Sequence, residues 1–395
     1  MELGLYEARE VLLSLVTPLE HTTFVPLASA LGRTTSKAIV CQKNLPSYNN
    51  AALDGFAFSF EGHPEELRIK ATIYAGMVLS PVLEKGECYK IMTGAKVPED
   101  ADTIVAFEDT LGYDATHVTL PPSVKKGNAF RHKGEEQAFG SVLMEANTTL
   151  TPSHIAMLAT QGITHVPVVT RPKVAIVSTG DELKEPWEQS GEDEIHNCNS
   201  YALVALLQSA GFEADYSGVI PDVLEESKRF IASLRTYDMV ISSGGISMGE
   251  ADFVRAGLEA NGFEATFHGI NIKPGRPTMV GRMGKTLVIS LPGNPMAAFL
   301  NAFLLAIPAL KKLAGMKSVT PPRLRATNTI SFTCKGGRNE LVLGWYEAGK
   351  FTVTRNNKYG SGMLTPLLES NAVLVSDVTE KQIDAGCEVS CVLLP

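Results

Sequence analysis

A glycine-rich segment in the second half of the chain combines the groups that phosphate recognition needs. It reads ISSGGISMGEADFVRAG over residues 241–257 and directly follows the apolar run YDMV. Glycines let backbone N–H groups approach an anion, serine hydroxyls add donors, and the start of the next helix adds its positive dipole end. The segment therefore predicts a site for a phosphorylated ligand. Its candidate binding residues are Ser242, Ser243, Gly244, Gly245 and Ser247.

Two carboxylates at the end of this segment need a separate explanation. Glu250 and Asp252 would repel a phosphate, so a bridging Mg²⁺ is the simplest hypothesis. Capping of the following helix is an equally good interpretation of Asp252. Carboxylates also follow other apolar runs, where a buried cluster is unfavourable unless a cation neutralises it. A solvated surface position is the alternative for Asp222. Four carboxylates lie at the edges of the candidate loops: Asp181, Glu182, Asp222 and Asp252.

The elements that must position these residues alternate regularly after Pro172. Apolar runs such as KVAIVS and YDMVIS alternate with helical patterns such as NSYALVALLQSAG and VLEESKRFIASLR. This alternation predicts right-handed crossovers and a mostly parallel sheet. In such a sheet, ligands bind beyond the carboxyl ends of the strands. The rule selects STGDEL (178–183), VIPD (219–222), SSGGISMGEAD (242–252) and LPGNP (291–295).

A basic turn, NIKPGRP over residues 271–277, is a candidate oxyanion site. Lys273 and Arg276 flank a proline and a glycine, so a stiff backbone would hold two cations in place. An exposed hairpin turn is the alternative, and LPGNP could likewise serve only to start a helix. His196 and Cys198 in IHNCN look like metal ligands, but no further ligand is suitably spaced. The lack of GKS, GKT and GxGxxG disfavours a P-loop or a nicotinamide site.

The composition of the 395-residue chain excludes several classes of protein. Its length predicts about two to four domains. A net charge of −8 without a Lys/Arg block disfavours binding to nucleic acid or to a membrane. The six cysteines form no CxxC pair, so we expect reduced thiols. With neither a signal-peptide pattern nor a run of about 18 apolar residues, we expect a cytoplasmic protein.

Different patterns flank the α/β region. Residues 3–16 show helical spacing, whereas the segment from about 45 to 140 consists of short β-rich runs between glycine and proline turns. The helical pattern TPSHIAMLATQG ends at Gly162. After Pro322, runs such as ELVLGWYE and KFTVTR predict a C-terminal β-barrel or sandwich.

Taken in order, these motifs resemble those of the MoeA family of molybdopterin molybdenumtransferases, which share their fold with the gephyrin E domain. The resemblance extends over nearly the whole chain, and its strength lies in the order of nine segments that are individually weak. They are AALDGFAF (51–58), IMTGAKVPEDADTIVAFED (91–109), GNAFRHKGEE (127–136), VAIVSTGDEL (174–183), GVIPD (218–222), SSGGISMGEADF (242–253), KPGRP (273–277), LPGNP (291–295) and GSGML (360–364).

The resemblance implies an elongated homodimer with a multidomain fold that combines α/β and β modules. The expected parts are a discontinuous N-terminal domain with a helical arm (1–45 and 141–171), an inserted β-rich domain (46–140), a central three-layer α/β molybdopterin-binding domain with a mostly parallel sheet (172–316), and a C-terminal β-barrel (317–395). Four residues of the first two parts would face the α/β site of the other subunit, so the active site would be an interface. They are Asp54, Thr93, Arg131 and Glu136.

The resemblance also implies a reaction. The family takes adenylylated molybdopterin and molybdate, cleaves the pyrophosphate linkage in a divalent-cation-dependent step, and releases AMP with the metal on the dithiolene. Lys273 and Arg276 would hold molybdate or phosphate, and transient contact with other molybdenum cofactor biosynthesis proteins is expected. The implied catalytic residues are Asp54, Thr93, Glu136, Glu182, Asp222 and Asp252, with Mg²⁺ on the last three. The implied substrate-binding residues are Arg131, Ser178, Thr179, Gly180, Ser243, Gly244, Gly245, Ser247, Lys273, Arg276, Pro292 and Pro295.

The chain departs from the family pattern at three places. Glu136 replaces a common Asp, Phe56 replaces a common Tyr, and HNCN replaces DSN. Glu136 would either contact metal or molybdate, or pair with a base such as Arg131 across the subunit interface. Two other functions fit part of the chain: the α/β domain alone resembles a molybdopterin adenylyltransferase, and the gephyrin E domain partly serves as a scaffold. The long flanking modules argue against the first, and the retained carboxylates and basic turns argue against the second.

Overall fold

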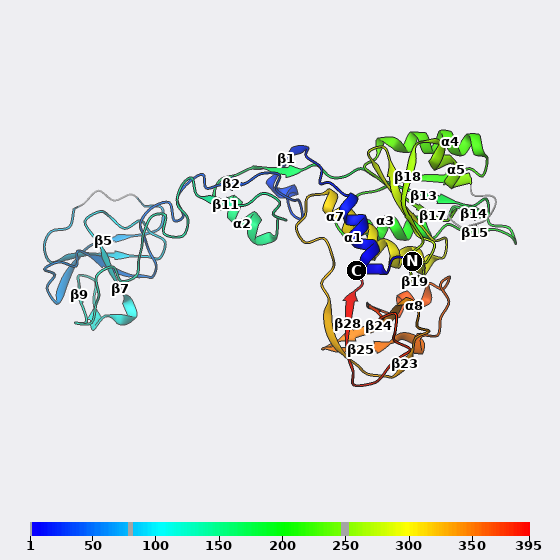
Figure 1. Ribbon diagram of the computed structural model, residues 1–395. Helices are drawn as coiled ribbons and strands as arrows, with labels where there is room; N and C mark the ends of the chain where they lie inside the picture. Colours follow the sequence, from blue (N-terminus) through cyan, green and yellow to red (C-terminus); the bar gives the residue numbers. More distant parts are fainter. Residues whose placement is uncertain (1, 78–81, 246–252) are drawn as a thin grey trace.

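The computed structural model describes residues 2–77, 82–245 and 253–395. The molecule is elongated, with a β-rich module at one end and an α/β module beside a C-terminal β-barrel at the other (Figure 1). A narrow arm joins the two ends, and both termini lie where the α/β module meets the barrel. The expected fold class is confirmed, whereas the domain boundaries stay a prediction.

Six strands form the sheet of the α/β module, in the order β16-β13-β17-β21-β20-β18. The first four are parallel, and β20 and β18 run antiparallel at one edge. Strands β13, β17 and β21 are almost continuous apolar runs, as expected for strands covered on both faces. The bounds are β13 (Val174–Thr179), β16 (Asp215–Ile220), β17 (Met239–Ser243), β18 (Phe263–His268), β20 (Met279–Met283) and β21 (Thr286–Leu291).

Helices cover both faces of this sheet and complete the three layers. Because successive strand residues point to opposite faces, Ile176 and Ile241 pack against one helical layer while Val177 and Val240 pack against the other. The first layer comprises α1 (Leu5–Leu15), α3 (Asn199–Ser209), α6 (Pro295–Asn301), the π-helical turn η4 (Ala302–Ala306) and α7 (Ile307–Leu313). The second comprises α4 (Leu224–Ser233), η3 (Leu234–Thr236) and α5 (Phe253–Ala260).

One continuous helical segment, Pro295–Leu313, has the length and apolar composition of a membrane span. It is the only such helix in the described part of the chain, and 83% of its most apolar window is buried inside the protein. A helix that is apolar all round and buried in this way is typical of a protein core.

The C-terminal strands close into a barrel. β24 pairs with both β25 and β26, so the order β24-β25-β22-β28-β26 returns to its start. β19 joins from outside, with Ile272 opposite Asn339 and Lys273 opposite Glu340, so the barrel holds the start of the basic turn. The elements are β19 (Ile272–Lys273), β22 (Leu324–Asn328), β23 (Phe332–Thr333), β24 (Asn339–Glu347), β25 (Lys350–Val353), η5 (Thr354–Asn357), α8 (Thr365–Leu368), β26 (Ala372–Val375), β27 (Gln382–Ile383) and β28 (Glu388–Leu393).

The β-rich module is a six-stranded sheet in the order β7-β4-β6-β5-β9-β8, with a small core on each face. Its elements are β4 (Gly55–Phe58), β5 (Glu66–Ile73), β6 (Glu87–Ile91), β7 (Thr103–Ala106), η2 (Phe107–Asp109), β8 (Gly112–Tyr113) and β9 (His117–Thr119). Short antiparallel pairs build the arm and its join to this module. They are β1 (Thr22–Pro26) with β12 (His165–Val169), β2 (Ile39–Val40) with β11 (Val142–Met144), and β3 (Asn50–Ala51) with β10 (Phe130–Arg131), beside η1 (Leu27–Ser29) and α2 (Pro152–Thr160). A further short pair, β14 (Leu183–Lys184) with β15 (Ile195–His196), borders the α/β sheet.

Candidate active site

A cavity of about 600 Å³ lies where the parallel strands of the α/β sheet end. Thr179 ends β13, Asp222 follows β16, Ser243 ends β17 and Pro292 follows β21. The cavity therefore occupies the position expected for a ligand in an open parallel sheet, and its volume is that of a small-molecule site. The predicted residues that line it are Ser178, Thr179, Gly180, Glu182, Asp222, Ser243, Gly244, Gly245, Pro292 and Pro295.

Three glycines adopt backbone conformations that other residues rarely take. Gly180 has a φ of 127°, Gly244 of 92° and Gly245 of 64°, all in the left-handed region that favours glycine. A Cβ at Gly244 would lie 2.6 Å from Thr179 Oγ1, and a Cβ at Gly245 would lie 2.6 Å from a methyl carbon of Val254. Glycine is therefore required here by backbone shape and packing, while contact with an anion stays a prediction.

Asn199 joins two of the loops around the cavity. Its Nδ2 donates to Ser243 Oγ at 2.7 Å and to the carbonyl oxygen of Gly293 at 2.7 Å. The sequence drew attention only to His196 and Cys198 in the same motif, as metal-like residues. Both line the cavity, but no group of three His, Cys, Asp or Glu residues suited to a metal is found within the described ranges. Sequence reasoning missed Asn199 because its two partners are remote in sequence.

A chain of hydrogen bonds begins at two residues that line the cavity, Ser178 and Asn197. Ser178 Oγ lies 2.6 Å from Ser200 Oγ and donates to Asn197 Oδ1 at 3.2 Å. Asn197 Nδ2 donates to the Tyr216 hydroxyl at 2.9 Å, and that hydroxyl donates to Glu185 at 2.5 Å. Burial, followed by the Glu185 carboxylate, raises the pKa of Tyr216. The phenol therefore stays protonated and fixes the Asn197 side chain as a neutral part of the wall.

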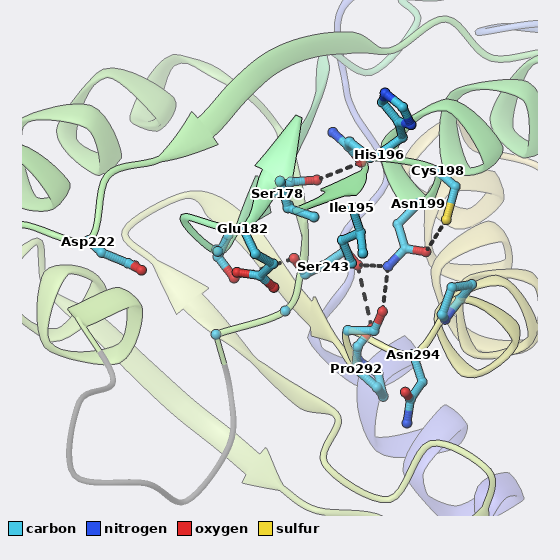
Figure 2. Close-up of a pocket in the computed structure, with 18 of the residues that line it drawn as sticks. Ser178, Glu182, Ile195, His196, Cys198, Asn199, Asp222, Ser243, Pro292 and Asn294 are labelled. Atoms are coloured by element: carbon cyan, nitrogen blue, oxygen red, sulfur yellow. Dashed lines mark hydrogen bonds between the residues drawn. The ribbon is translucent and has the colours of Figure 1, made fainter. Parts of the chain in front are cut away.

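Two of the predicted metal ligands, Glu182 and Asp222, lie on the side of the cavity away from Asn199 (Figure 2). Burial raises the pKa of Asp222, and the negative charges of Asp181 and Glu182 raise it further. No Lys, Arg or His among the described residues forms an ion pair with Asp222. An acidic group of this kind fits a hard divalent cation, which prefers carboxylate oxygens. Three further residues that the sequence singled out in the loop after β17, Ser247, Glu250 and Asp252, lie outside the described residues.

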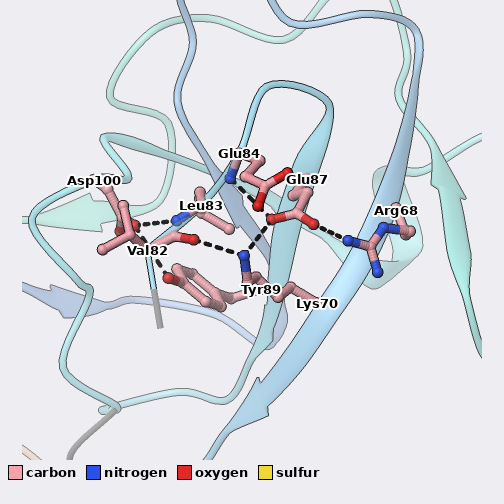
Figure 3. A network of polar contacts seen from close by, with 8 residues as sticks. All are labelled: Arg68, Lys70, Val82, Leu83, Glu84, Glu87, Tyr89 and Asp100. Carbon is pink, nitrogen blue, oxygen red and sulfur yellow. Dashed lines mark hydrogen bonds and ion pairs between the residues drawn. The ribbon is translucent and has the colours of Figure 1, made fainter. Parts of the chain in front are cut away.

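The buried carboxylate of Glu87 in the β-rich module provides a contrast (Figure 3). Its side chain is only 4% exposed, but Lys70 Nζ lies 2.7 Å from one oxygen and the backbone N–H of Glu84 donates to the same oxygen at 2.9 Å. Arg68 contacts the other oxygen. The hydrogen bond from Lys70 is the largest cause of a lowered pKa at Glu87. Glu87 is thus neutralised by cations of its own module, whereas Asp222 has no ion-pair partner among the described residues of the chain.

A second cavity, of about 300 Å³, shares Pro277 with the first. Lys273 and Arg276 line this second cavity, so the structure separates the two predicted bases from the strand-end loops that line the first cavity. Arg338 and Ser361 line it as well. The sequence did not predict Arg338, because it reaches the turn only through the pairing of β19 with β24; Ser361 lies in the quoted GSGML motif.

Both bases of the turn have carboxylate partners. Lys273 Nζ lies 3.4 Å from the Glu340 carboxylate, whose side chain is 4% exposed. Arg276 binds Glu2 with two nitrogens, the shorter contact being 2.6 Å. The hydrogen bond from Arg276 is the largest cause of a lowered pKa at Glu2, and Glu2 in turn raises the pKa of Arg276. The turn is therefore a set of oriented cations rather than a pair of freely solvated ones.

Comparison with known proteins decides the family. Residues 3–162 match the MoeA N-terminal region (domain I and II), residues 175–312 match a probable molybdopterin binding domain, and residues 325–394 match the MoeA C-terminal region (domain IV). A molybdopterin molybdenumtransferase of Haemophilus influenzae is 32% identical over 97% of this chain and 96% of its own length. The chain belongs to the MoeA family.

Other relatives agree over the same length. A molybdopterin molybdenumtransferase of a Nostoc species is 30% identical over 95% of this chain and 89% of its own. The crystal structure of the molybdopterin biosynthesis moeA protein from Pyrococcus horikoshii OT3 superposes with a TM-score of 0.85 at 29% identity, covering both chains completely. The resemblance drawn from the nine motifs is therefore confirmed at the level of the family.

The remaining MoeA-type residues, in the β-rich module and its join, gather around β3. Asp54 accepts hydrogen bonds from the N–H and the hydroxyl of Thr93, both at 2.6 Å. Arg131 lies opposite Asn50 on β3, and its guanidinium lies 2.7 Å from Glu135 and 3.6 Å from Glu136. Arg131 and Glu136 therefore pair within one chain, although the closer partner is Glu135.

This group is far from the 600 Å³ cavity of the same chain. Asp54 directly precedes β4, which pairs with β7, and β7 lies at the opposite end of the molecule from β13 and β17 (Figure 1). The structure thus brings the predicted residues together in three separate groups. They are the strand-end cavity, the basic cavity beside it, and the group around β3.

Proposed function

We propose that this protein inserts molybdenum from molybdate into adenylylated molybdopterin and releases AMP. Family membership supports this function, because its relatives are named molybdopterin molybdenumtransferases. The observation that carries the proposal is the pair of adjoining cavities, one lined by hydroxyls and carboxylates and the other by bases. A reaction that joins a small oxyanion to a larger phosphorylated substrate needs two such compartments at a fixed separation.

In this proposal each cavity has its own task. The backbone at Gly244 and Gly245, with the Ser243 hydroxyl, binds the phosphates of the adenylylated substrate. Lys273 and Arg276 bind molybdate, because oriented cations hold an oxyanion without reorganisation. The stiff LPGNP loop, with Pro292 and Pro295, supplies the wall between α3 and the phosphates.

The acidic side of the first cavity would hold Mg²⁺. Glu182 and Asp222 supply the carboxylate oxygens, and Asp252 is proposed as a third ligand from the sequence. When bound, the cation would stabilise the charge that develops as the pyrophosphate linkage breaks. The raised pKa of Asp222, caused first by burial and then by the charges of Asp181 and Glu182, supports this assignment, because a bound cation would stabilise the ionised carboxylate against both effects.

We further propose a homodimer in which the group around β3 completes the partner's cavity. Within one chain, Asp54 and Thr93 are too remote to reach the substrate, so they need a second subunit to take part. The arm also exposes apolar side chains: Val40 and Val142 lie opposite each other on β2 and β11, and Phe139 is 70% exposed. A second copy that covers this strand pair would bury them. We place this enzyme in the cytoplasm, in transient contact with other molybdenum cofactor biosynthesis proteins.

The test is to incubate the purified protein with adenylylated molybdopterin, molybdate and Mg²⁺ and to measure AMP and molybdenum-loaded product. We expect both, and we expect neither when the adenylylated substrate is omitted. Formation of the adenylylated species from ATP and molybdopterin would instead indicate an adenylyltransferase. A protein that binds the substrate but releases no AMP under any of these conditions would be a scaffold, and the proposal would be wrong.

A further inference from the structure

Asn301 is a fully buried polar residue at the end of α6, with 0% of its surface exposed. Its Nδ2 donates to the carbonyl oxygen of Gly275 at 3.0 Å and to Thr278 Oγ1 at 2.7 Å. The Thr278 hydroxyl donates in turn to the same Gly275 carbonyl oxygen at 2.9 Å. Asn301 thereby closes a three-membered hydrogen-bonded cluster around the middle of the basic turn.

The contact between Asn301 and the turn is tight as well as polar. Gly275 has a φ of 107°, in the left-handed region, and a Cβ there would lie 2.3 Å from Asn301 Nδ2 and 2.7 Å from Asn301 Oδ1. The Asn301 amide therefore lies against the Cα of Gly275. Any side chain at position 275 would occupy the space that the amide fills. The position of Asn301 and the shape of the turn determine each other.

The other end of the amide is unfavourably placed. Asn301 Oδ1 is buried and has no hydrogen-bond partner among the described residues. A buried acceptor without a partner destabilises a fold, and an apolar side chain of similar volume would avoid that cost. The helix also widens into the π-helical turn η4 directly after Asn301, a distortion that is frequent at functional sites. The unpaired acceptor makes asparagine a poor choice for stability at this position. The two hydrogen bonds that it donates to the turn give a different reason for its presence.

The turn that Asn301 holds presents the bases of the second cavity. Lys273 and Arg276 stand on either side of Gly275, and both line that cavity. Movement of the Gly275 carbonyl would change the direction of both side chains, because they share one short backbone loop. A small displacement of charged groups around a bound anion has a large effect on binding.

We propose that Asn301 is a positioning residue for oxyanion binding: it holds the Lys273–Pro277 turn in the form that directs both bases into the second cavity. The inference rests on the proposed function, in which that cavity binds molybdate. Asn301 does not touch the oxyanion itself and acts through the backbone of the turn.

The chain offers a matched control in Asn328, at the end of β22 in the barrel. It is also 0% exposed, its Nδ2 donates to the carbonyl oxygens of Ile330 at 2.8 Å and Asp384 at 3.0 Å, and its Oδ1 is likewise buried without a partner. Asn301→Leu and Asn328→Leu therefore remove chemically equivalent groups at two places, of which only one contacts the basic turn.

The experiment measures binding of sodium molybdate to the full chain by calorimetry, with thermal unfolding of each variant alongside. We expect both variants to lower the melting temperature, but only Asn301→Leu to raise the molybdate dissociation constant, by about tenfold or more, as expected when a charge-assisted contact is lost. In turnover, Asn301→Leu should raise KM for molybdate and leave KM for the adenylylated substrate unchanged. Asn301→Ser, which is smaller and easier to accommodate, should lie between wild type and Asn301→Leu, and it decides the matter if the leucine variant does not fold.

Two failures are distinguishable. If the wild-type protein binds no molybdate, the oxyanion assignment of the second cavity is wrong, and this inference falls with it. If the wild type binds molybdate and the Asn301 variants bind it as tightly as Asn328→Leu does, the cavity assignment stands and the positioning role of Asn301 is refuted.

Discussion

A mixture of two inactive variants tests whether the active site is shared between subunits. Asp54→Asn damages the group around β3, and Asp222→Asn damages the strand-end cavity of the α/β module. Within one chain these groups belong to modules at opposite ends of the molecule (Figure 1). If a complete site needs both groups, it must take one from each subunit.

The expected activity follows from counting sites. A heterodimer of the two variants has one site in which both groups are damaged and one in which both are intact, so it should show about half of wild-type activity. Random pairing makes about half of all dimers mixed, so an unsorted mixture should show about a quarter. If each chain used only its own groups, every site would carry one defect and no mixture would recover.

The assay is AMP release by heterodimers that are co-expressed with two different affinity tags and purified on both. The matched control pairs a wild-type chain with a chain carrying Asp54→Asn and Asp222→Asn together. Shared sites predict no activity for that control, because each site then has one defect, whereas self-contained sites predict about half. Activity in the control with none in the mixed heterodimer would refute the shared site.

Three further outcomes are expected. Burial and neighbouring carboxylates raise the folded-state pKa of Asp222, so its ionisation destabilises the fold as pH rises through that pKa. Asp222→Asn should therefore raise the melting temperature at pH 7 by a few degrees, at about 2–4 °C per kcal/mol for a domain of this size. The same variant should lose the stabilisation that Mg²⁺ gives the wild type. Glu2→Gln removes the carboxylate that orients Arg276 and should weaken molybdate binding in calorimetry by about two- to fivefold, a modest change because the pair is partly solvated. Tighter binding would mean that Glu2 competes with the oxyanion for Arg276 and does not orient it for binding. Glu136→Asp should change steady-state AMP release by less than about twofold, because the 3.6 Å contact with Arg131 is partly exposed. Glu136→Gln, in contrast, should weaken substrate binding or the dimer, as measured by KM and light scattering. A large fall in turnover for Glu136→Asp with an unchanged dimer would contradict this expectation.

The sequence was sufficient for the central fold because its signals are local. Apolar runs such as VAIVST and helical patterns such as NSYALVALLQS alternate at the spacing of βαβ units, and the structure has them as β13 and α3. The antiparallel edge formed by β18 and β20 and the closure of the barrel through β24 were not predictable in detail. These depend on pairings between strands that carry no partner-specific pattern.

The same distinction holds for the site. The loops after β13, β16, β17 and β21 could be named from sequence because the ends of parallel strands meet at one edge. Asn199, Arg338 and Asn301 could not, because each acts through a contact with a remote segment. Asn301 lies 26 residues from Gly275, in the middle of an apolar helical pattern where a buried amide has no sequence signature.

The two cavities are held at a fixed separation by contacts between the α/β module and the barrel. β19 leads into the basic turn and pairs with β24, while Asn294 of the LPGNP loop donates to Ser361 Oγ at 3.0 Å. The barrel therefore contacts the base-lined cavity through one loop and the hydroxyl-lined cavity through the other. Cleavage of a pyrophosphate alone would need only the first compartment, whereas transfer of a metal oxyanion needs a second one at a constant distance from it. On this reasoning the barrel serves the proposed reaction by coupling delivery of the oxyanion to release of AMP.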